Sequence, residues 1–153
     1  MADPRVGLVP AGPCDLDPLL AMMERFYATE RYAFDPHVAR AALGELLAKP
    51  ELGRAWRIAR GAETLGYAVL TFGWSLEWGG RDAFVDEIFI EAPERGRGAG
   101  RSALRALVEE ARRLGVRALH LEVEVGNEAG QALYRSEGFR GNERRILTRR
   151  LDG

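Results

Sequence analysis

The chain has 153 residues, with 22 Lys and Arg against 23 Asp and Glu, so its formal net charge is −1. This length predicts one domain over residues 1–153, and the balanced charge excludes bulk attraction to nucleic acid or to an anionic membrane. The sequence has no apolar run of about 18 residues, its start does not resemble a signal peptide, and its single cysteine, Cys14, excludes an internal disulfide. We therefore expect a cytoplasmic location, with no nucleic-acid or membrane partner.

The first half of the chain predicts two helices set among strands. Asp15 or Asp17 is suited to cap the first helix, and proline in the first turn after Asp35 is typical of a helix start. The predicted elements are a strand over 6–9, a helix from Asp15 or Asp17 to Tyr27, a helix from Asp35-Pro36 to Lys49-Pro50, and strands over 56–59, 65–74 and 83–90.

The second half shows clearer periodicity. Apolar residues three or four apart predict a helix from Gly98 that Gly115 ends. Strict alternation over 119–125 predicts a strand, Asn127 caps a helix that ends at Gly138, and residues 145–151 predict a last strand. The order of elements indicates an α+β or α/β domain with a mixed sheet.

Residues 95–101 read Arg-Gly-Arg-Gly-Ala-Gly-Arg between a predicted strand and a predicted helix. A glycine-rich turn at a helix start leaves backbone N–H groups available to an anion, and three arginines add positive charge there. The P-loop motif is excluded because no lysine follows these glycines, the only lysine being Lys49. The spacing also fails the dinucleotide-binding fingerprint. The loop therefore predicts a phosphate site of another kind.

Two motifs carry a resemblance to a known family. Arg95-x-x-Gly98-x-Gly100, followed by Asn127 and then by Leu133-Tyr134-x-x-x-Gly138-Phe139, resembles the GNAT superfamily of acetyl-CoA-dependent N-acetyltransferases. The match is best over 83–140, and the order of elements extends it over the chain. One departure is Gly130, where the second motif usually has alanine. The resemblance implies an α+β, three-layer fold with a mixed, mostly antiparallel sheet whose splayed central strands are flanked by helices.

The resemblance also implies a cofactor, acetyl-CoA, which leaves as coenzyme A. In the family, the glycine-rich loop holds the pyrophosphate and the backbone of the preceding strand bonds the pantetheine arm. The implied cofactor-binding residues are Ile88, Phe89, Ile90, Arg95, Gly96, Arg97, Gly98, Ala99, Gly100, Arg101 and Asn127.

Acetylation of an amine requires a proton acceptor. An amine with the pKa of lysine costs about 4.6 kcal/mol to deprotonate at pH 7, so a carboxylate near the reaction centre is expected. In GNAT enzymes an acid nine residues before the motif arginine often takes this proton, and that position corresponds to Asp86. Glu87 is adjacent, and regular alternation would point it to the opposite face. Both are candidate catalytic acids, with Asp86 preferred.

The departing thiolate requires a proton donor. Tyr134 matches the family tyrosine that supplies it. Full transfer from a phenol to a thiolate is uphill by about 2 kcal/mol, so Tyr134 is interpreted as a hydrogen-bond donor to sulfur that completes transfer in the transition state.

Acids and aromatic residues gather where GNAT enzymes build the acceptor site. Such a mixture suits a cationic amine through cation–π contacts and ion pairs, although surface acids with core or homodimer-interface aromatics explain the same residues. The candidates for substrate binding are Tyr27, Glu30, Tyr32, Trp74 and Asp82.

The string from Gly79 to Ile90 also resembles the diamine and polyamine acetyltransferase branch of GNAT. We therefore expect an N-acetyltransferase that acts on a small cationic primary amine by direct attack. The alternatives are a protein or peptide N-acetyltransferase and a non-catalytic acyl-CoA-binding module. With two histidines and one cysteine, no metal cluster is expected.

Overall fold

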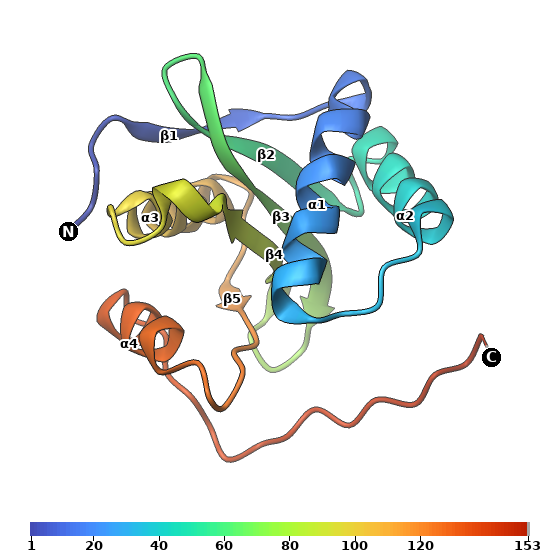
Figure 1. Ribbon diagram of the computed structural model, residues 1–153. Coiled ribbons are helices and arrows are strands. Elements are labelled where there is room, and N and C mark those ends of the chain that lie inside the picture. Colours follow the sequence, from blue (N-terminus) through green and yellow to red (C-terminus); the bar gives the residue numbers. More distant parts are fainter. Residues whose placement is uncertain (153) are drawn as a thin grey trace. The chain divides into compact units, whose positions relative to one another are not determined.

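The computed structural model of the chain describes residues 1–152 (Figure 1). The backbone forms two compact units, Met1–Glu122 and the residues from Val123 onward, and each is described by itself. A single domain over 1–153 stays a prediction, and Gly153 lies outside the described residues. No helix within residues 1–152 is both long enough and apolar enough to cross a membrane.

The first unit is built on a five-stranded sheet of order β1-β2-β3-β4-β5. Its strands are β1 (Val6–Pro10), β2 (Gly53–Arg60), β3 (Glu63–Ser75), β4 (Gly80–Ile90) and β5 (Ala118–His120). Neighbouring strands are antiparallel except β4 and β5, which are parallel. The predicted mixed, mostly antiparallel sheet is confirmed.

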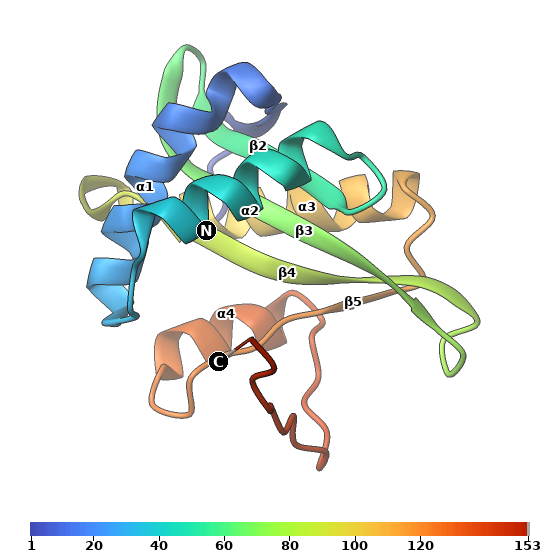
Figure 2. The same cartoon turned by 90° about the vertical axis from the view of Figure 1, so that its right-hand side faces the viewer.

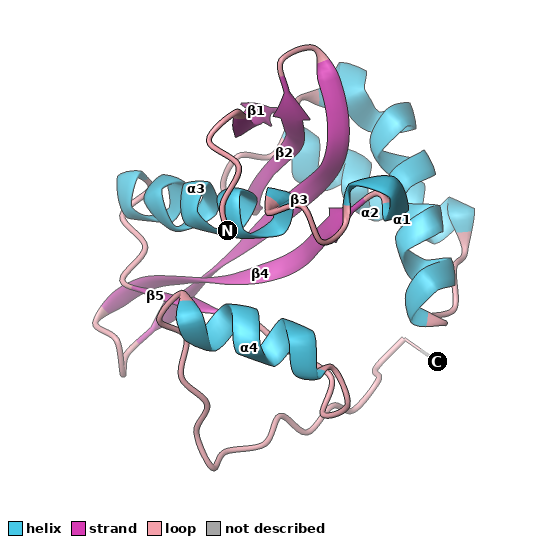
Figure 3. Ribbon diagram, turned by 60° about the vertical axis from the view of Figure 1, so that its left-hand side comes forward, coloured by secondary structure: helices cyan, strands magenta, loops and turns pink. Residues whose placement is uncertain are grey.

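Helices cover both faces of this sheet, with α1 (Leu16–Glu30) and α2 (Pro36–Ala48) on one face and α3 (Ala99–Arg113) on the other (Figures 2 and 3). Asp35 begins α2 as predicted, because its side chain accepts hydrogen bonds from the backbone N–H groups of His37 and Val38. The sheet therefore separates two apolar layers, as expected for a three-layer α+β fold.

Alternate residues of the central strands fill these two layers. Tyr67 and Phe89 pack with α1 and α2 residues such as Leu19, whereas Leu70 and Val85 pack with α3 residues. Leu19 and Leu70 are fully buried, and burying a leucine side chain stabilises a fold by about 1.5–3 kcal/mol. The two faces of β3 and β4 are thus fixed by two separate apolar clusters.

One extra residue interrupts β4. Val69 lies opposite Glu87, but the next residue of β3, Leu70, lies opposite Val85, so Asp86 has no partner in the ladder. This is a β-bulge, in which two residues on one strand face one on the other. Val85 consequently belongs to the α3 layer while Glu87 bonds to Tyr27 of α1. The regular alternation that would set Asp86 and Glu87 on opposite faces therefore fails here.

The parallel pairing of β4 with β5 is short. It joins Asp82 to Ala118, Ala83 to Leu119 and Phe84 to His120, and β4 then continues to Ile90 without β5 beside it. The predicted strand over 119–125 is wrong beyond His120, because the alternating residues after it have no ladder partner among the described residues. This separation matches the splayed central strands that the family resemblance implies.

The second unit contains α4 (Glu128–Ser136). As predicted, Asn127 caps this helix, its side chain accepting a hydrogen bond of 2.9 Å from the N–H of Gly130. The predicted strand over 145–151 is wrong, since these residues carry no regular structure. Ile146 and Leu147 are exposed, and β-forming residues make a strand only where a neighbouring strand pairs with them.

Candidate active site

A buried carboxylate of β4 is hydrogen-bonded to side chains of α1 and β3. Glu87 is 9% exposed and accepts hydrogen bonds from the hydroxyl groups of Tyr27 on α1 and Tyr67 on β3, the latter at 2.7 Å. Burial raises the pKa of Glu87, and the two tyrosine hydrogen bonds partly oppose that rise. Burial, together with the Glu87 charge, also raises the pKa of both tyrosines. The three side chains form a fixed, hydrogen-bonded group.

Asp86 occupies the bulge next to this group. Its side chain reaches solvent, yet the atoms packed around it and the nearby charge of Glu122 raise its pKa. The Asp86 charge also contributes to the raised pKa of Tyr27 and Glu87. The structure therefore brings the two predicted catalytic acids together, with Asp86 accessible and Glu87 held by tyrosines.

The end of β4 presents backbone groups away from β3. The N–H of Glu91 donates to the carbonyl of Leu65 at 2.8 Å, and peptide groups alternate along a strand. The N–H of Phe89 is therefore directed toward β3. The N–H groups of Ile88 and Ile90 are directed toward the opposite edge of β4, where β5 no longer pairs with it. Of the three strand residues predicted to bind the cofactor, Ile88 and Ile90 have suitably directed backbone groups, and Phe89 is buried in the core.

The glycine-rich loop joins this strand end to α3. Gly96 and Gly98 have φ of +76° and +84°, the left-handed region that glycine adopts without steric cost. Gly98 is the N-cap of α3. An ideal Cβ on Gly98 would lie 1.8 Å from the carbonyl oxygen of Met1. Glycine is therefore required at 98 by both backbone angle and packing.

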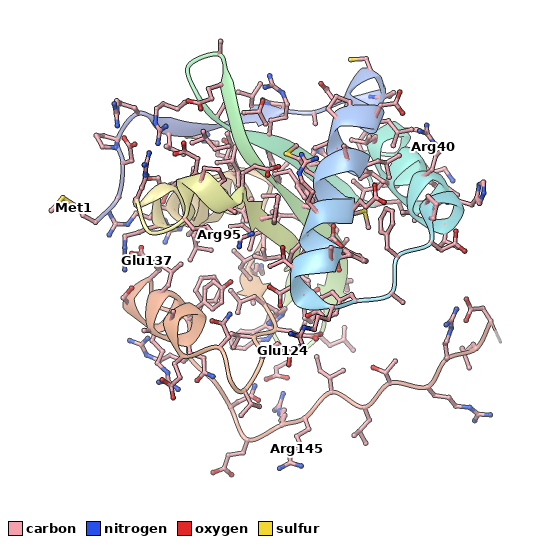
Figure 4. The ribbon with its side chains drawn as sticks, viewed as in Figure 1. Met1, Arg40, Arg95, Glu124, Glu137 and Arg145 are labelled. Carbon is pink, nitrogen blue, oxygen red and sulfur yellow. The ribbon has the colours of Figure 1, made fainter. Side chains whose placement is uncertain are left out.

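The remaining loop residues lie where the sequence predicted them. Figure 4 labels Arg95 between β4 and α3, and its Nε donates to the Ile90 carbonyl at 2.9 Å. Arg97 is exposed, while Ala99, Gly100 and Arg101 form the first turn of α3. The loop thus combines a helix N-terminus with positive charge, which suits an anion.

Aromatic rings line the neighbouring end of α1. Tyr27 meets Tyr32 edge to face at a centroid distance of 5.8 Å, and it meets Phe34 at 5.6 Å. The structure thus brings together Tyr27 and Tyr32, two predicted substrate-binding residues, whereas Glu30 is an exposed residue at the end of α1. Sequence reasoning missed Phe34, although the density of aromatic residues over 26–34 was a signal for it.

The other two predicted acceptor residues lie elsewhere on the sheet. Asp82 bonds to His120, with Oδ2 and Nε2 3.0 Å apart, and it precedes Asp86 by four strand residues, or about 13 Å at the usual rise. Trp74 lies opposite Arg81, beyond Asp82, and is 76% exposed. The structure therefore does not bring Trp74 and Asp82 to the Glu87 group.

In the second unit, Tyr134 lies on α4 and meets Phe139 edge to face at a centroid distance of 6.1 Å. A physical reason also explains why Gly130 departs from the family motif. A Cβ on Gly130 would lie 2.5 Å from Nδ2 of Asn127, so glycine leaves room for the capping side chain at the start of α4.

No group of three or more metal-ligating side chains occurs within residues 1–152. The chemistry that this site offers comes from carboxylates, tyrosine hydroxyls and backbone groups. Tyr67, which completes the Glu87 group, was missed by the sequence analysis, because nothing in a buried strand marks one tyrosine as a hydrogen-bond donor.

Comparison with known proteins identifies the class. Residues 19–139 match the family model described as acetyltransferase (GNAT) family, so the chain belongs to this family. Membership confirms the predicted enzyme class, the acetyltransferases of the GNAT family, whose members use acetyl-CoA as their cofactor.

Individual relatives agree with this assignment. An L-methionine sulfoximine/L-methionine sulfone acetyltransferase of Pseudomonas aeruginosa is 36% identical over 78 residues, which cover 50% of this chain and 44% of that protein. The chain spans about half the length of the curated relatives that it matches, or less.

Solved structures extend the likeness over nearly the whole chain. An integron cassette protein from the mobile metagenome of Cole Harbour Salt Marsh is 37% identical with a TM-score of 0.84, covering 98% of this chain and 92% of that one. A predicted acetyltransferase from Clostridium acetobutylicum, described with acetyl-CoA, has a TM-score of 0.78 at 18% identity and covers 94% of this chain and 96% of that one. The latter likeness concerns the fold alone.

The buried position of Glu87 predicts an unusual pH dependence of stability. A carboxyl whose pKa is raised by folding stabilises the protein below its ordinary pKa, and this contribution is lost as pH rises through the raised value. The amide introduced by Glu87→Gln stays neutral at every pH. The melting temperature of this variant relative to wild type should therefore rise as the pH increases from the ordinary pKa of glutamate toward neutral pH.

Glu45→Gln is the matched control, because Lys49 lowers the pKa of the Glu45 carboxyl. Its melting temperature relative to wild type should fall or stay level over the same range. Thermal unfolding of the three proteins at several pH values measures both trends. A constant difference between Glu87→Gln and wild type would contradict the raised pKa.

Proposed function

We propose that this chain transfers the acetyl group of acetyl-CoA to the primary amino group of a small cationic substrate by direct attack. The observation that carries the proposal is the pair of acids at the β4 bulge, Asp86 beside the tyrosine-bonded Glu87, next to the aromatic end of α1. The P. aeruginosa relative is named for small amino-acid derivatives, which supports a small-molecule acceptor.

The cofactor residues fit an elongated anionic thioester. Backbone N–H groups at the start of α3 and the arginines around them are suited to a pyrophosphate. Ile88 and Ile90, with backbone groups directed away from β3, are suited to the amides of the pantetheine arm. We assign Gly96 to Arg101 to the former group and retain Asn127 as a predicted contact. The bound cofactor supplies an activated acetyl group as a thioester.

Asp86 is proposed as the proton acceptor. Its side chain is accessible, whereas both oxygens of Glu87 already accept tyrosine hydrogen bonds. The ionised form of Asp86 takes a proton from the ammonium, directly or through water, which leaves the amine nucleophilic. Glu87 holds Tyr27 in place and adds negative charge that attracts a cation.

Tyr134 is proposed to donate a hydrogen bond to the leaving sulfur. The assignment rests on its position in the second family motif. Its hydroxyl stabilises the developing thiolate and completes proton transfer in the transition state.

The acceptor is proposed to bind near Tyr27 and Tyr32, whose rings suit a cation. Glu30, Trp74 and Asp82 remain predicted contacts. Because Asp82 lies about 13 Å from Asp86 along β4, a substrate that touches both must be long and extended, as a polyamine is, whereas a short diamine would reach only one of them.

A thiol-release screen with acetyl-CoA should show faster turnover of small diamines than of neutral amines or peptides. Asp86→Asn should lower kcat by roughly 10²-fold. The acid limb of the wild-type rate profile should lie above the ordinary pKa of aspartate, since the Asp86 pKa is raised, and it should vanish in the variant.

Asp17→Asn on the exposed side of α1, where Asp17 pairs with Arg40, should leave the rate unchanged. Efficient turnover of peptides with none of diamines would replace this proposal with a protein acetyltransferase. Coenzyme binding without turnover of any amine would indicate a regulatory module.

Tyr134→Phe retains the ring that packs on Phe139 and removes only the hydroxyl. We expect kcat to fall by roughly 10²-fold with little change in the dissociation constant of acetyl-CoA, measured by single-turnover kinetics and calorimetry. An unchanged single-turnover rate would mean that Tyr134 serves only in packing.

A further inference from the structure

Two ion pairs with other elements hold the segment 91–94, which leads into the glycine-rich turn. Glu91 pairs with Arg25 of α1 at 2.7 Å, and Glu94 pairs with Arg60 of β2 at 3.0 Å. The Arg25 side chain is 54% exposed, whereas that of Arg60 is 19% exposed. Ion pairs that solvent reaches contribute little, so the Arg60 contact is the stronger restraint.

Arg60 joins two sheltered carboxylates. Its Nη2 lies 3.0 Å from Oε2 of Glu94 and 3.2 Å from Oδ2 of Asp3. The side chains of Asp3 and Glu94 are only 8% and 13% exposed. Asp3 also pairs with Arg5 at 3.0 Å, so removing the Arg60 guanidinium would chiefly take a partner from the poorly solvated Glu94 carboxylate.

The Asp3 contact also reaches the far side of the turn. The carbonyl of Asp3 accepts a hydrogen bond from the Ser102 hydroxyl in the first turn of α3 at 2.7 Å. The neighbouring Met1 carbonyl lies against Gly98, and Figure 4 shows Met1 beside α3. Arg60 therefore links Glu94, which precedes residues 95–98, to a segment that packs on the residues following them.

Charge gives Arg60 a second role at this place. Glu94 is adjacent to Arg95 in the loop, so its carboxylate would repel an anion bound there. The Arg60 guanidinium neutralises that carboxylate, which matters because it is shielded from water and its field is weakly screened.

We propose that Arg60 is a positioning residue for the phosphates of acetyl-CoA, holding the two ends of the 95–98 turn and masking the charge of Glu94. This inference rests on the proposed function, in which the turn binds the pyrophosphate. It concerns a residue of β2, far in sequence from both family motifs.

The test compares acetyl-CoA with S-acetylpantetheine, a donor that lacks the pyrophosphate. Arg60→Met should raise the KM and the dissociation constant for acetyl-CoA by about tenfold with kcat unchanged. The kcat/KM for S-acetylpantetheine should not change. In Arg60→Met/Glu94→Gln the repelling charge is gone, so most of the affinity for acetyl-CoA should return.

Arg57→Met is the matched control, because Arg57 lies on the same strand and bonds to Thr64 at 2.7 Å; it should behave as wild type. Equal losses with both donors, or no recovery in the double variant, would overturn the proposal and leave Arg60 as a stabilising residue. A wild-type protein that does not bind acetyl-CoA would instead overturn the proposed function.

Glu94→Gln alone keeps the inference testable if Arg60→Met fails to fold. Removing this acid while Arg60 remains should tighten acetyl-CoA binding and leave S-acetylpantetheine turnover unchanged. Unchanged or weaker acetyl-CoA binding in Glu94→Gln would contradict the masking role of Arg60.

Discussion

A single extra residue in β4 is the constraint on which the site depends. The bulge at Asp86 keeps Val85 in the α3 layer and turns Glu87 toward α1. There two tyrosine hydroxyl groups donate hydrogen bonds to the Glu87 carboxylate. In a regular strand Glu87 would share the face of Val85 and enter the apolar α3 layer, where an unpaired carboxylate is costly. The same bulge leaves Asp86 accessible to solvent. One irregularity therefore gives the two neighbouring acids different surroundings, since Glu87 is hydrogen-bonded to tyrosines and Asp86 can reach a substrate.

The end of β4 then connects this acid pair to the glycine-rich turn. Because β5 pairs with β4 only as far as Phe84, the backbone of Ile88 and Ile90 is directed to a side that no described strand of the first unit occupies. The turn that follows needs glycine at 96 and 98 for its left-handed angles. The acid pair, the strand residues that β5 does not pair with and the glycine-rich turn thus follow one another in sequence from Asp86 to Arg101.

The features predicted from sequence were those with local signals. Asp35 before proline marked the start of α2, the apolar repeat marked α3, and Asn127 marked α4. The bulge at Asp86 had no such signal, because it depends on how β3 pairs with β4. The prediction of a strand over 145–151 failed for the same reason, because strand propensity does not supply a neighbouring strand to pair with. The contacts of Arg60 and Tyr67 join residues distant in sequence, which a single sequence does not reveal.

Calorimetry of Arg97→Glu measures whether the turn over 95–101 binds the phosphates of acetyl-CoA. Arg97 is exposed in the turn, whereas Arg112, at the other end of α3, pairs with Glu109. We predict micromolar binding to wild type, binding at least about tenfold weaker to Arg97→Glu, and near wild-type binding to Arg112→Glu. Equal affinities of the two variants for acetyl-CoA would mean that the turn over 95–101 does not hold the phosphates.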